Sequence, residues 1–306
     1  MRRRLFAPEV IQSSAMDCGP AALKALLEGH GIHVAYGRLR EACQTDVDGT
    51  SIDSLEVVAR QLGLDAEQVM LPSDHLLVPS ANALPALLVV RLATGATHFV
   101  VAWRKLGPWV EVMDPATGRR FLTRRRFLAQ VYRHRHTVPA DAWREWAGTD
   151  EHCEPLGERL GRVGVSTTDS AALIEAARDE PSWRSIAALD AATRMSRELL
   201  DSGALGRTET ARLVPRLTRR VREHGVDAIP EAFWSVSPVD DDGLALHLRG
   251  AVLVRVRGRR SGAGTDDVDT DAEPADQPEA ATDSPSTPPI DRDTLPPELV
   301  AARDET

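Results

Sequence analysis

The sequence predicts an α+β protein in which helices pack on an antiparallel sheet, and two observations carry this prediction. Apolar residues in the first 65 positions recur at helical spacing, whereas residues 86–113 hold short apolar runs separated by turns. Helices followed by consecutive strands favour α+β over a parallel sheet, in which strands alternate with helices. Beyond residue 140 the helical patterns return, and residues 261–306 have a composition of their own.

Turn and capping residues set the bounds of the first elements. Gly19-Pro20 is expected to open a helix at 18–30, because proline is tolerated in the first turn of a helix. Ser51 is expected to cap another helix, which ends at Gly63. The remaining expectations are a short helix at 36–43, strands at 86–92, 98–103, 109–113 and 121–122, and a closing helix at 124–132.

The chain is expected to form three parts. We place an α+β domain at 1–140, a mainly α-helical accessory region with a C-terminal β-hairpin at 141–260, and a tail at 261–306. In the second part, residues 141–165 are expected to be a connector. Helices are expected at 169–178, 183–200 and 208–224, and the hairpin at 244–256, turning at Arg249-Gly250.

Charge separates the tail from the rest of the chain. The whole chain carries a net charge of -9, and residues 261–306 hold 13 acids and two arginines, so the first 260 residues carry +2. The tail is rich in Asp, Pro and Thr and poor in large apolar residues, which predicts disorder. No window reaches the roughly 18 apolar residues of a membrane span, and no apolar run follows the basic start. Three cysteines fit a reducing cytoplasm.

Four residues in chain order predict thiol chemistry. Cys18 begins a predicted helix, where the positive helix end lowers the pKa of a thiol. A nucleophilic cysteine needs a base and a group that orients the base. His98 begins one strand and Asp114 ends the next, so a short turn can bring them together. Gln12 precedes Cys18 by six positions, where its amide could donate to an oxyanion. This order is that of papain-like cysteine peptidases.

The local sequences around these residues resemble a known family. The segment Gln12–Leu23 reads QSSAMDCGPAAL, and it is followed by Asp48-Gly49-Thr50-Ser51, Thr97–Val101 (THFVV) and Asp114-Pro115 with Gly118. These blocks resemble the bacteriocin-processing, or double-glycine, cysteine peptidase family. In that family the domain is usually the N-terminal part of a peptidase-containing ABC transporter. The resemblance covers roughly residues 8–138.

The resemblance implies a papain-like fold and cleavage of a leader peptide after a Gly-Gly pair. Cys18 would attack the carbonyl, His98 would take up and return the proton, Asp114 would orient the imidazole, and Gln12 would stabilise the oxyanion. The leader would bind as an amphipathic helix in a shallow apolar groove. The sequence contains neither membrane spans nor a GxxxxGK[ST] phosphate loop. We therefore expect a detached peptidase, or one that works with a separately encoded ABC transporter, in the cytoplasm or peripherally at the inner face of the cell membrane.

Two other functions stay open at this stage. The first is a non-catalytic module that docks leader peptides for an exporter, against which the presence of Cys18 argues. The second keeps the thiol chemistry but changes the reaction to acyl transfer or isopeptide hydrolysis. The acceptor discriminates them, because hydrolysis releases a free acid and transfer forms an amine adduct.

We expect no cofactor and no metal. The stretch at 46–49 lacks the spacing of a calcium loop, and no further ligands converge on His134 and His136. Cys43 is expected to be buried, and Cys153 to be an incidental thiol in the connector. A basic cluster is expected to be a solvated face or a contact for anionic lipid or a transporter: Arg119, Arg120, Arg124, Arg125 and Arg126. It lacks interleaved aromatic residues, so we expect no nucleic-acid partner.

Overall fold

The computed structural model describes residues 3–45, 49–240 and 242–260. Its first three helices lie where the sequence predicts them: α1 (Cys18–Gly29), α2 (Tyr36–Ala42) and α3 (Ile52–Gln61). Ser51 caps α3 as expected, because its hydroxyl accepts a hydrogen bond from the Ser54 backbone N–H at 3.1 Å. Gly63 follows with a φ of 92°, a left-handed conformation that suits glycine and ends the helix.

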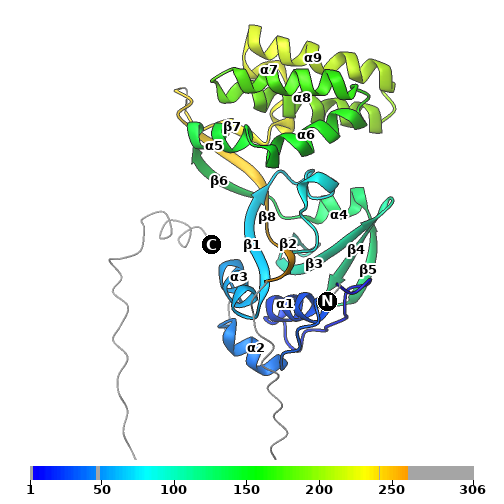
Figure 1. The fold of residues 1–306 in the computed structure, drawn as a ribbon, viewed down its shortest axis with the longest axis vertical. Helices are drawn as coiled ribbons and strands as arrows, with labels where there is room; N and C mark the ends of the chain where they lie inside the picture. The colour runs from blue at the N-terminus through cyan, green and yellow to red at the C-terminus, as the bar shows by residue number, and fades with distance from the viewer. Residues whose placement is uncertain (1–2, 46–48, 241, 261–306) are drawn as a thin grey trace, which may run out of the picture. The chain divides into compact units, whose positions relative to one another are not determined.

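The strands form an antiparallel sheet in the order β1-β8-β2-β3-β4-β5 (Figure 1). Its members are β1 (Leu64–Leu71), β2 (Ala86–Arg91), β3 (Thr97–Leu106), β4 (Trp109–Asp114), β5 (Gly118–Thr123) and β8 (Ala245–Arg259). The four strands predicted between residues 86 and 123 are confirmed, and so is the α+β class. Strand β1 is not predicted by the sequence, because only its first, third and last residues are buried and its polar residues hide the alternation of apolar and polar side chains.

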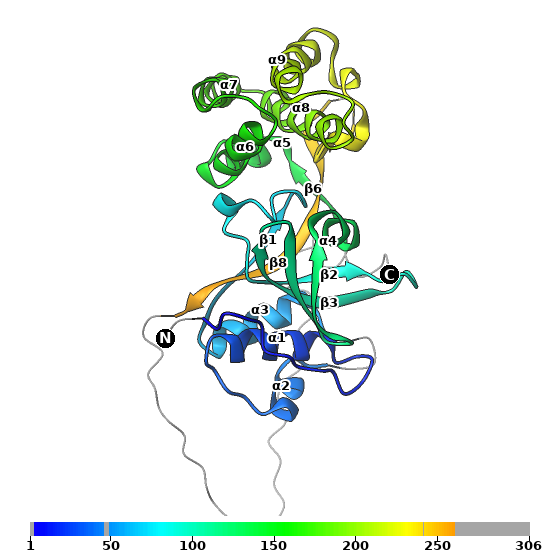
Figure 2. The same ribbon diagram turned by 90° about the vertical axis from the view of Figure 1, so that its right-hand side faces the viewer.

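Helices cover both faces of this sheet. Helices α1 and α3 pack on one face through a core that includes Leu26, Val101 and Trp103. Helix α4 (Arg124–Gln130) packs on the other face, where Phe127 is fully buried in a second core. Figure 2 shows α4 on the opposite side of β2 and β3 from α1 and α3. A helix that starts at Cys18 is thereby held against the strand that starts at Thr97.

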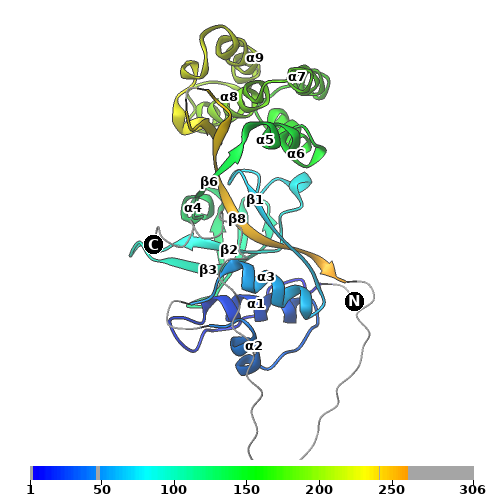
Figure 3. The ribbon, with the colours of Figure 1, turned by 90° about the vertical axis from the view of Figure 1, so that its left-hand side faces the viewer.

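The middle of the sheet is filled by the last described strand. The C-terminal half of β8 pairs with β1 from Leu71↔Ala251 to Leu64↔Arg259, and on its other side with β2. The N-terminal half pairs with β6 (His134–Pro139) and β7 (Val236–Pro238) instead. Figure 3 shows β8 running from the helical region into the sheet. One continuous strand therefore belongs to both parts of the molecule.

The expected hairpin at 244–256 is wrong, because these residues belong to a single strand. Arg249-Gly250 is not a turn. A side chain at Gly250 would place its Cβ 2.5 Å from the Leu71 backbone oxygen. Glycine is therefore needed at this position because β8 and β1 approach each other closely.

The helical region begins earlier than the sequence predicts. It comprises α5 (Ala140–Ala147), α6 (Asp150–Arg162), α7 (Thr167–Asp179), α8 (Trp183–Asp201), α9 (Arg207–His224) and the short η2 (Val226–Ala228) and η3 (Glu231–Phe233). The expected connector at 141–165 is therefore wrong. Its buried residues do recur at helical spacing, as Cys153, Leu156 and Leu160 show, but Gly148, Pro155 and three further glycines obscure the pattern.

Buried ion pairs attach the helical region to the loop after β1. Arg159 of α6 bonds to Asp74 at 2.5 Å and also contacts Asp190 of α8, which is completely buried. Arg194 reaches both carboxylates at 3.0 Å. Removing one member of such a network leaves an uncompensated buried charge, which typically costs about 3–5 kcal/mol. The network and β8 are two independent links between the sheet and the helices.

The division of the chain at residues 140 and 260 stays a prediction. Residues 251–259 pair with the strands of the first part, although they lie in the second. The predicted disordered tail at 261–306 falls outside the described residues. Among the residues that the structure describes, no helix is both long enough and apolar enough to span a membrane.

Two glycines of β8 provide a matched test of the central strand. Gly250→Ala should destabilise the fold by about 1–3 kcal/mol, because the new methyl group has no room beside the Leu71 carbonyl. Gly258→Ala should not destabilise it, because nothing lies within 4 Å of a Cβ at that position. Thermal denaturation followed by circular dichroism measures both. Equal melting temperatures for the two variants would contradict the placement of β8.

Candidate active site

The N-terminal segment is tied to the sheet at successive points before it reaches α1. The Ala7 backbone N–H donates to the buried Glu111 carboxylate at 2.8 Å. The Gln12 backbone N–H donates to the Pro115 carbonyl at 2.9 Å, next to the end of β4. These bonds bring Gln12 to the turn that follows Asp114. The Gln12 amide oxygen is buried and has no hydrogen-bond partner among the described residues.

Cys18 is the first residue of α1 and is partly exposed. The next residue, Gly19, is buried, and a Cβ there would lie 3.3 Å from both Leu55 and Thr50. Glycine thus allows the start of α1 to sit close to the start of α3. The thiol is placed at the positive end of a 12-residue helix, as the sequence predicts.

His98 and Asp114 are brought together by the register of β3 and β4. Val101 pairs with Met113, so the residues toward the open end of the two strands, His98 and Asp114, lie beside each other. The His98 ring Nε2 is 2.8 Å from Asp114 Oδ1. This contact engages one ring nitrogen and leaves Nδ1 for the thiol of Cys18. Both side chains are almost completely buried.

Two further groups hold the Asp114 carboxylate. The Ala116 backbone N–H donates to Oδ1 at 2.9 Å, and Arg120 Nη2 lies 2.6 Å from Oδ2. Burial by itself would raise the pKa of Asp114, but its bonds to His98 and Ala116 outweigh burial and lower it. The carboxylate therefore stays ionised and fixed in orientation.

The electrostatics favour a thiolate beside an imidazolium. Burial by itself would raise the pKa of the Cys18 thiol, but hydrogen bonds from His98 and the Phe99 backbone hold it below its ordinary value. Burial would likewise lower the pKa of His98, yet its bonds to Asp114 and Cys18 raise it to about 9. Between the two pKa values the pair exists as Cys⁻ and His⁺, the form in which the sulfur is nucleophilic.

Sequence reasoning missed Asp17 and Arg120. Asp17 is completely buried just before the thiol, where it accepts from Ser13 Oγ at 2.6 Å and lies 2.9 Å from Arg40 Nε of α2. These contacts hold the segment that precedes α1 against α2. The sequence places Arg120 in a basic cluster that is expected at the surface. The turn between Asp114 and Gly118 sets a hairpin register that would have placed Arg120 near Asp114.

The other residues singled out by the sequence lie elsewhere. Cys43 is buried, and Cys153 is buried in α6 rather than in a connector. His134 and His136 lie in β6, and the described ranges contain no group of three His, Cys, Asp or Glu residues that could hold a metal. The stretch 46–48 is outside the described residues.

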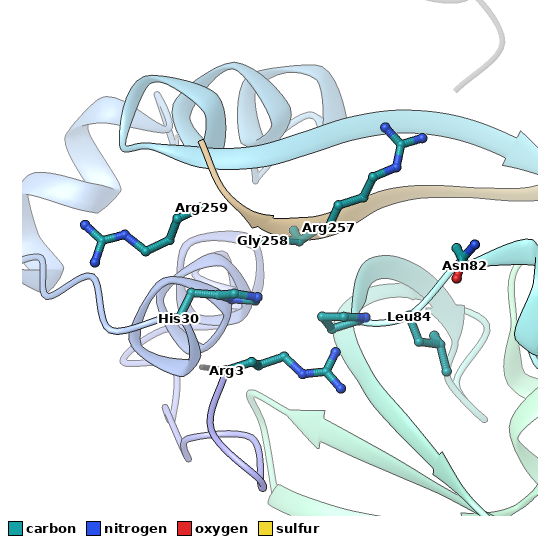
Figure 4. A pocket seen from close by; sticks show the side chains of 9 residues that line it. Arg3, His30, Asn82, Leu84, Arg257, Gly258 and Arg259 are labelled. Carbon is teal, nitrogen blue, oxygen red and sulfur yellow. The ribbon is translucent and has the colours of Figure 1, made fainter. Parts of the chain in front are cut away.

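A hollow of about 480 Å³ lies at the far end of α1 (Figure 4). His30, Arg3 and Arg257 line it. His30 follows the last residue of α1, whereas Cys18 is the first, and a helix of 12 residues is about 18 Å long. This hollow is therefore separate from the cysteine, histidine and aspartate described above.

Comparisons with known proteins agree with this geometry. Residues 7–132 match the peptidase C39 family. An uncharacterised protein of Methanothermobacter thermautotrophicus is 33% identical over 124 residues, which are 40% of this chain and 81% of that protein. The chain belongs to the peptidase C39 family. It is accordingly a cysteine peptidase, with an antiparallel sheet and a helix that begins at the cysteine, as in the papain-like arrangement.

Other C39 relatives are longer or more distant. The lactococcin G processing and transport ATP-binding protein of Lactococcus lactis is 29% identical over 110 residues, 36% of this chain, and the match spans only 16% of that relative. A solved double-glycine-motif protease from an AMS/PCAT transporter, in complex with the leader peptide, is 24% identical. It covers 43% of this chain and 89% of its own, with a TM-score of 0.37. Strand β8 lies outside the residues that match the family.

Thiol alkylation tests the predicted ion pair. Cys18 should react with iodoacetamide well below pH 8.5, roughly the pKa of an unperturbed thiol, because its own pKa is lowered. His98→Ala should shift the reaction to higher pH, because the hydrogen bond and charge of His98 are lost and only backbone hydrogen bonds then oppose burial. Peptide mapping by mass spectrometry reads each cysteine separately. Cys43 is an internal control, since burial raises its pKa to about 11. A Cys18 profile that is unchanged by His98→Ala would contradict the pairing.

Proposed function

We propose that this protein is an endopeptidase that removes the leader of a ribosomally made peptide, cutting after a Gly-Gly pair. The observation that carries the proposal is the bond between His98 and Asp114 at 2.8 Å, beside a thiol whose pKa is lowered at the start of α1. Membership of the C39 family supports peptide-bond hydrolysis. The processing and transport function in the name of the Lactococcus relative supports a leader peptide as the substrate.

In the proposed reaction, the Cys18 thiolate attacks the carbonyl carbon of the second glycine. The His98 imidazolium then gives its proton to the leaving amine, and the carbon–nitrogen bond breaks to leave a thioester. Water, deprotonated by the neutral imidazole, attacks the thioester and releases the leader as a free acid. Asp114 keeps the ring oriented and stabilises its positive charge throughout. These roles require the order of contacts Cys18, His98, Asp114 that the side chains adopt.

We assign the oxyanion contact to Gln12. Its backbone is bonded to Pro115, beside Asp114, so its side-chain amide starts next to the residues proposed for catalysis. The amide N–H is then available to a negatively charged oxygen at the reacting carbon. One such donor contributes about 10²- to 10³-fold to kcat.

The leader is proposed to dock on the N-terminal segment. Four large apolar side chains of this segment are exposed to between 40% and 67%: Leu5, Phe6, Ile11 and Met16. Ile11 reaches β5, since its Cδ1 lies 3.8 Å from a Cβ built on Gly118. An exposed apolar strip that leads toward the reactive thiol suits the apolar face of an amphipathic helix.

We propose that this protein cleaves the precursor peptide before the peptide is exported. A separately encoded ABC transporter at the inner face of the membrane is the proposed partner, since the Lactococcus relative joins processing and transport in one name. The site would then act on the cytoplasmic side, where the precursor is made.

A cleavage assay read by mass spectrometry tests the function. A synthetic leader peptide with Gly-Gly followed by a short cargo should be cut after the second glycine, and the leader should leave as a free acid. Cys18→Ala should lower the rate by about 10³-fold or more, and Gln12→Ala by about 10²- to 10³-fold. An amine adduct in place of the acid would indicate acyl transfer. Equal leader binding by wild type and Cys18→Ala without any cleavage would instead favour a docking module.

The same assay tests the docking strip with a matched pair of variants. Ile11→Asp should raise KM with little change in kcat, because it removes an apolar contact with the leader rather than a reacting group. Val57→Asp changes an equally exposed apolar residue on α3, 51% exposed against 56% for Ile11, and should leave both constants unchanged. An equal rise in KM for the two variants would contradict the assignment.

A further inference from the structure

A cavity of about 980 Å³ lies among α4, α6, α8 and the segment at 232–235, away from Cys18 and His98. Eight of the residues that line it are arginines, and three are acids: Asp74, Glu198 and Asp201. We refer to it as the arginine cavity. Such an excess of one charge around a hollow raises the local concentration of ions of the opposite sign.

Five of these arginines are paired with carboxylates. Arg159 and Arg194 belong to the buried network described above. Arg162 lies 2.5 Å from Glu158 and Arg197 lies 2.5 Å from Asp201. Arg249 contacts Glu231. These five charges are neutralised within the protein.

The other three, Arg124, Arg125 and Arg133, have no carboxylate within 4.0 Å in the part of the chain that the structure describes. Arg124 is half-buried at the start of α4. Burial lowers the pKa of its guanidinium, and the nearby positive charges of Arg197 and Arg162 lower it further. Arg125 and Arg133 are exposed, so the desolvation cost that an anion would offset falls on Arg124.

The shape and chemistry of the arginine cavity indicate the class of anion. The planar fork of a guanidinium matches the oxygens of a phosphate group, to which it donates two parallel hydrogen bonds. Three guanidinium groups without a carboxylate partner carry more positive charge than the roughly -2 of one phosphate group, so they can accommodate more than one phosphate. Leu128, Ala129 and Phe233 add an apolar wall, and the volume suits a small molecule. We propose that the arginine cavity binds a small organic molecule that carries two or more phosphate groups.

This proposal does not depend on the peptidase function, because none of the residues around the cavity belongs to the cysteine site. It also divides the basic cluster seen in the sequence. Arg119 and Arg120 turn toward Glu9 and Asp114, whereas Arg124 and Arg125 face the cavity.

Isothermal titration calorimetry on the full chain tests the proposal, with pyrophosphate and ATP as probes and sulfate as the control anion. Arg124→Gln and Arg125→Gln should each weaken binding by about tenfold, the loss of a charge-assisted hydrogen bond. Arg126→Gln is the matched control. It removes the same charge from the same helix, but Arg126 is exposed and does not line the cavity, so the affinity should stay within about twofold. Without ligand, Arg124→Gln should melt no lower than wild type, because it removes a cation from a positive field.

Three results would overturn the proposal. Absence of binding to both pyrophosphate and ATP would show that the cavity takes no organic polyphosphate. Equal weakening by Arg126→Gln would reduce the effect to diffuse surface charge. Tighter binding of hexaglutamate than of pyrophosphate would identify the cavity as a site for peptide carboxylates instead.

Discussion

The insertion of β8 between β1 and β2 is the constraint on which the rest of the structure depends. Through residues 251–259, the last described strand joins β1, with α3 on its face, to the strands that carry His98 and Asp114. Helix α1 packs against both sides of this junction, since Gly19 approaches Leu55 of α3 while the body of the helix lies on β3. The distance between the thiol and the imidazole is thus set partly by a strand that follows the helical region in sequence. A strand that follows the helical region in sequence is therefore part of the sheet that carries the site.

Side chains of alternating charge fix the orientation of the groups that the sheet brings together. Arg120 and the Ala116 N–H hold Asp114, Asp114 holds His98, and His98 favours the thiolate of Cys18. His98 and Asp114 are buried, so leaving either of them unpaired would be costly, and the contacts support one another. Glu111 plays a comparable part for the N-terminal segment, because it accepts from Ala7 and pairs with Arg104 at 2.8 Å. The reactive group and the segment that carries Gln12 are therefore fixed to the same two strands.

Local sequence patterns predicted most of the helix ends and strands that depend on interactions between neighbouring residues. Ser51 and Gly63 marked the ends of a helix, and the apolar runs between residues 86 and 113 marked strands, because capping and side-chain alternation are properties of neighbouring residues. The residues proposed for catalysis were also predicted, since the motifs around Cys18 and His98 are specific. What could not be predicted depends on contacts distant in sequence. Gly250 resembles a turn residue until Leu71 is placed beside it, and Arg120 resembles a surface residue until β5 is paired with β4. The ion pairs that join Asp74 to Arg159 of α6 and Arg194 of α8 have no local sequence pattern, because their members are distant in the chain.

A covalent trap tests the central claim most directly, namely that Cys18 is the nucleophile of a leader-directed site. A synthetic leader that ends in Gly-Gly with a chloromethyl ketone in place of the scissile amide would be incubated with the full chain, and the modified residue identified by mass spectrometry. The account predicts one adduct per molecule, on Cys18, formed much more slowly by the His98→Ala variant and by a probe with a scrambled leader. An adduct on Cys43 or Cys153, or equal labelling by the scrambled probe, would contradict it.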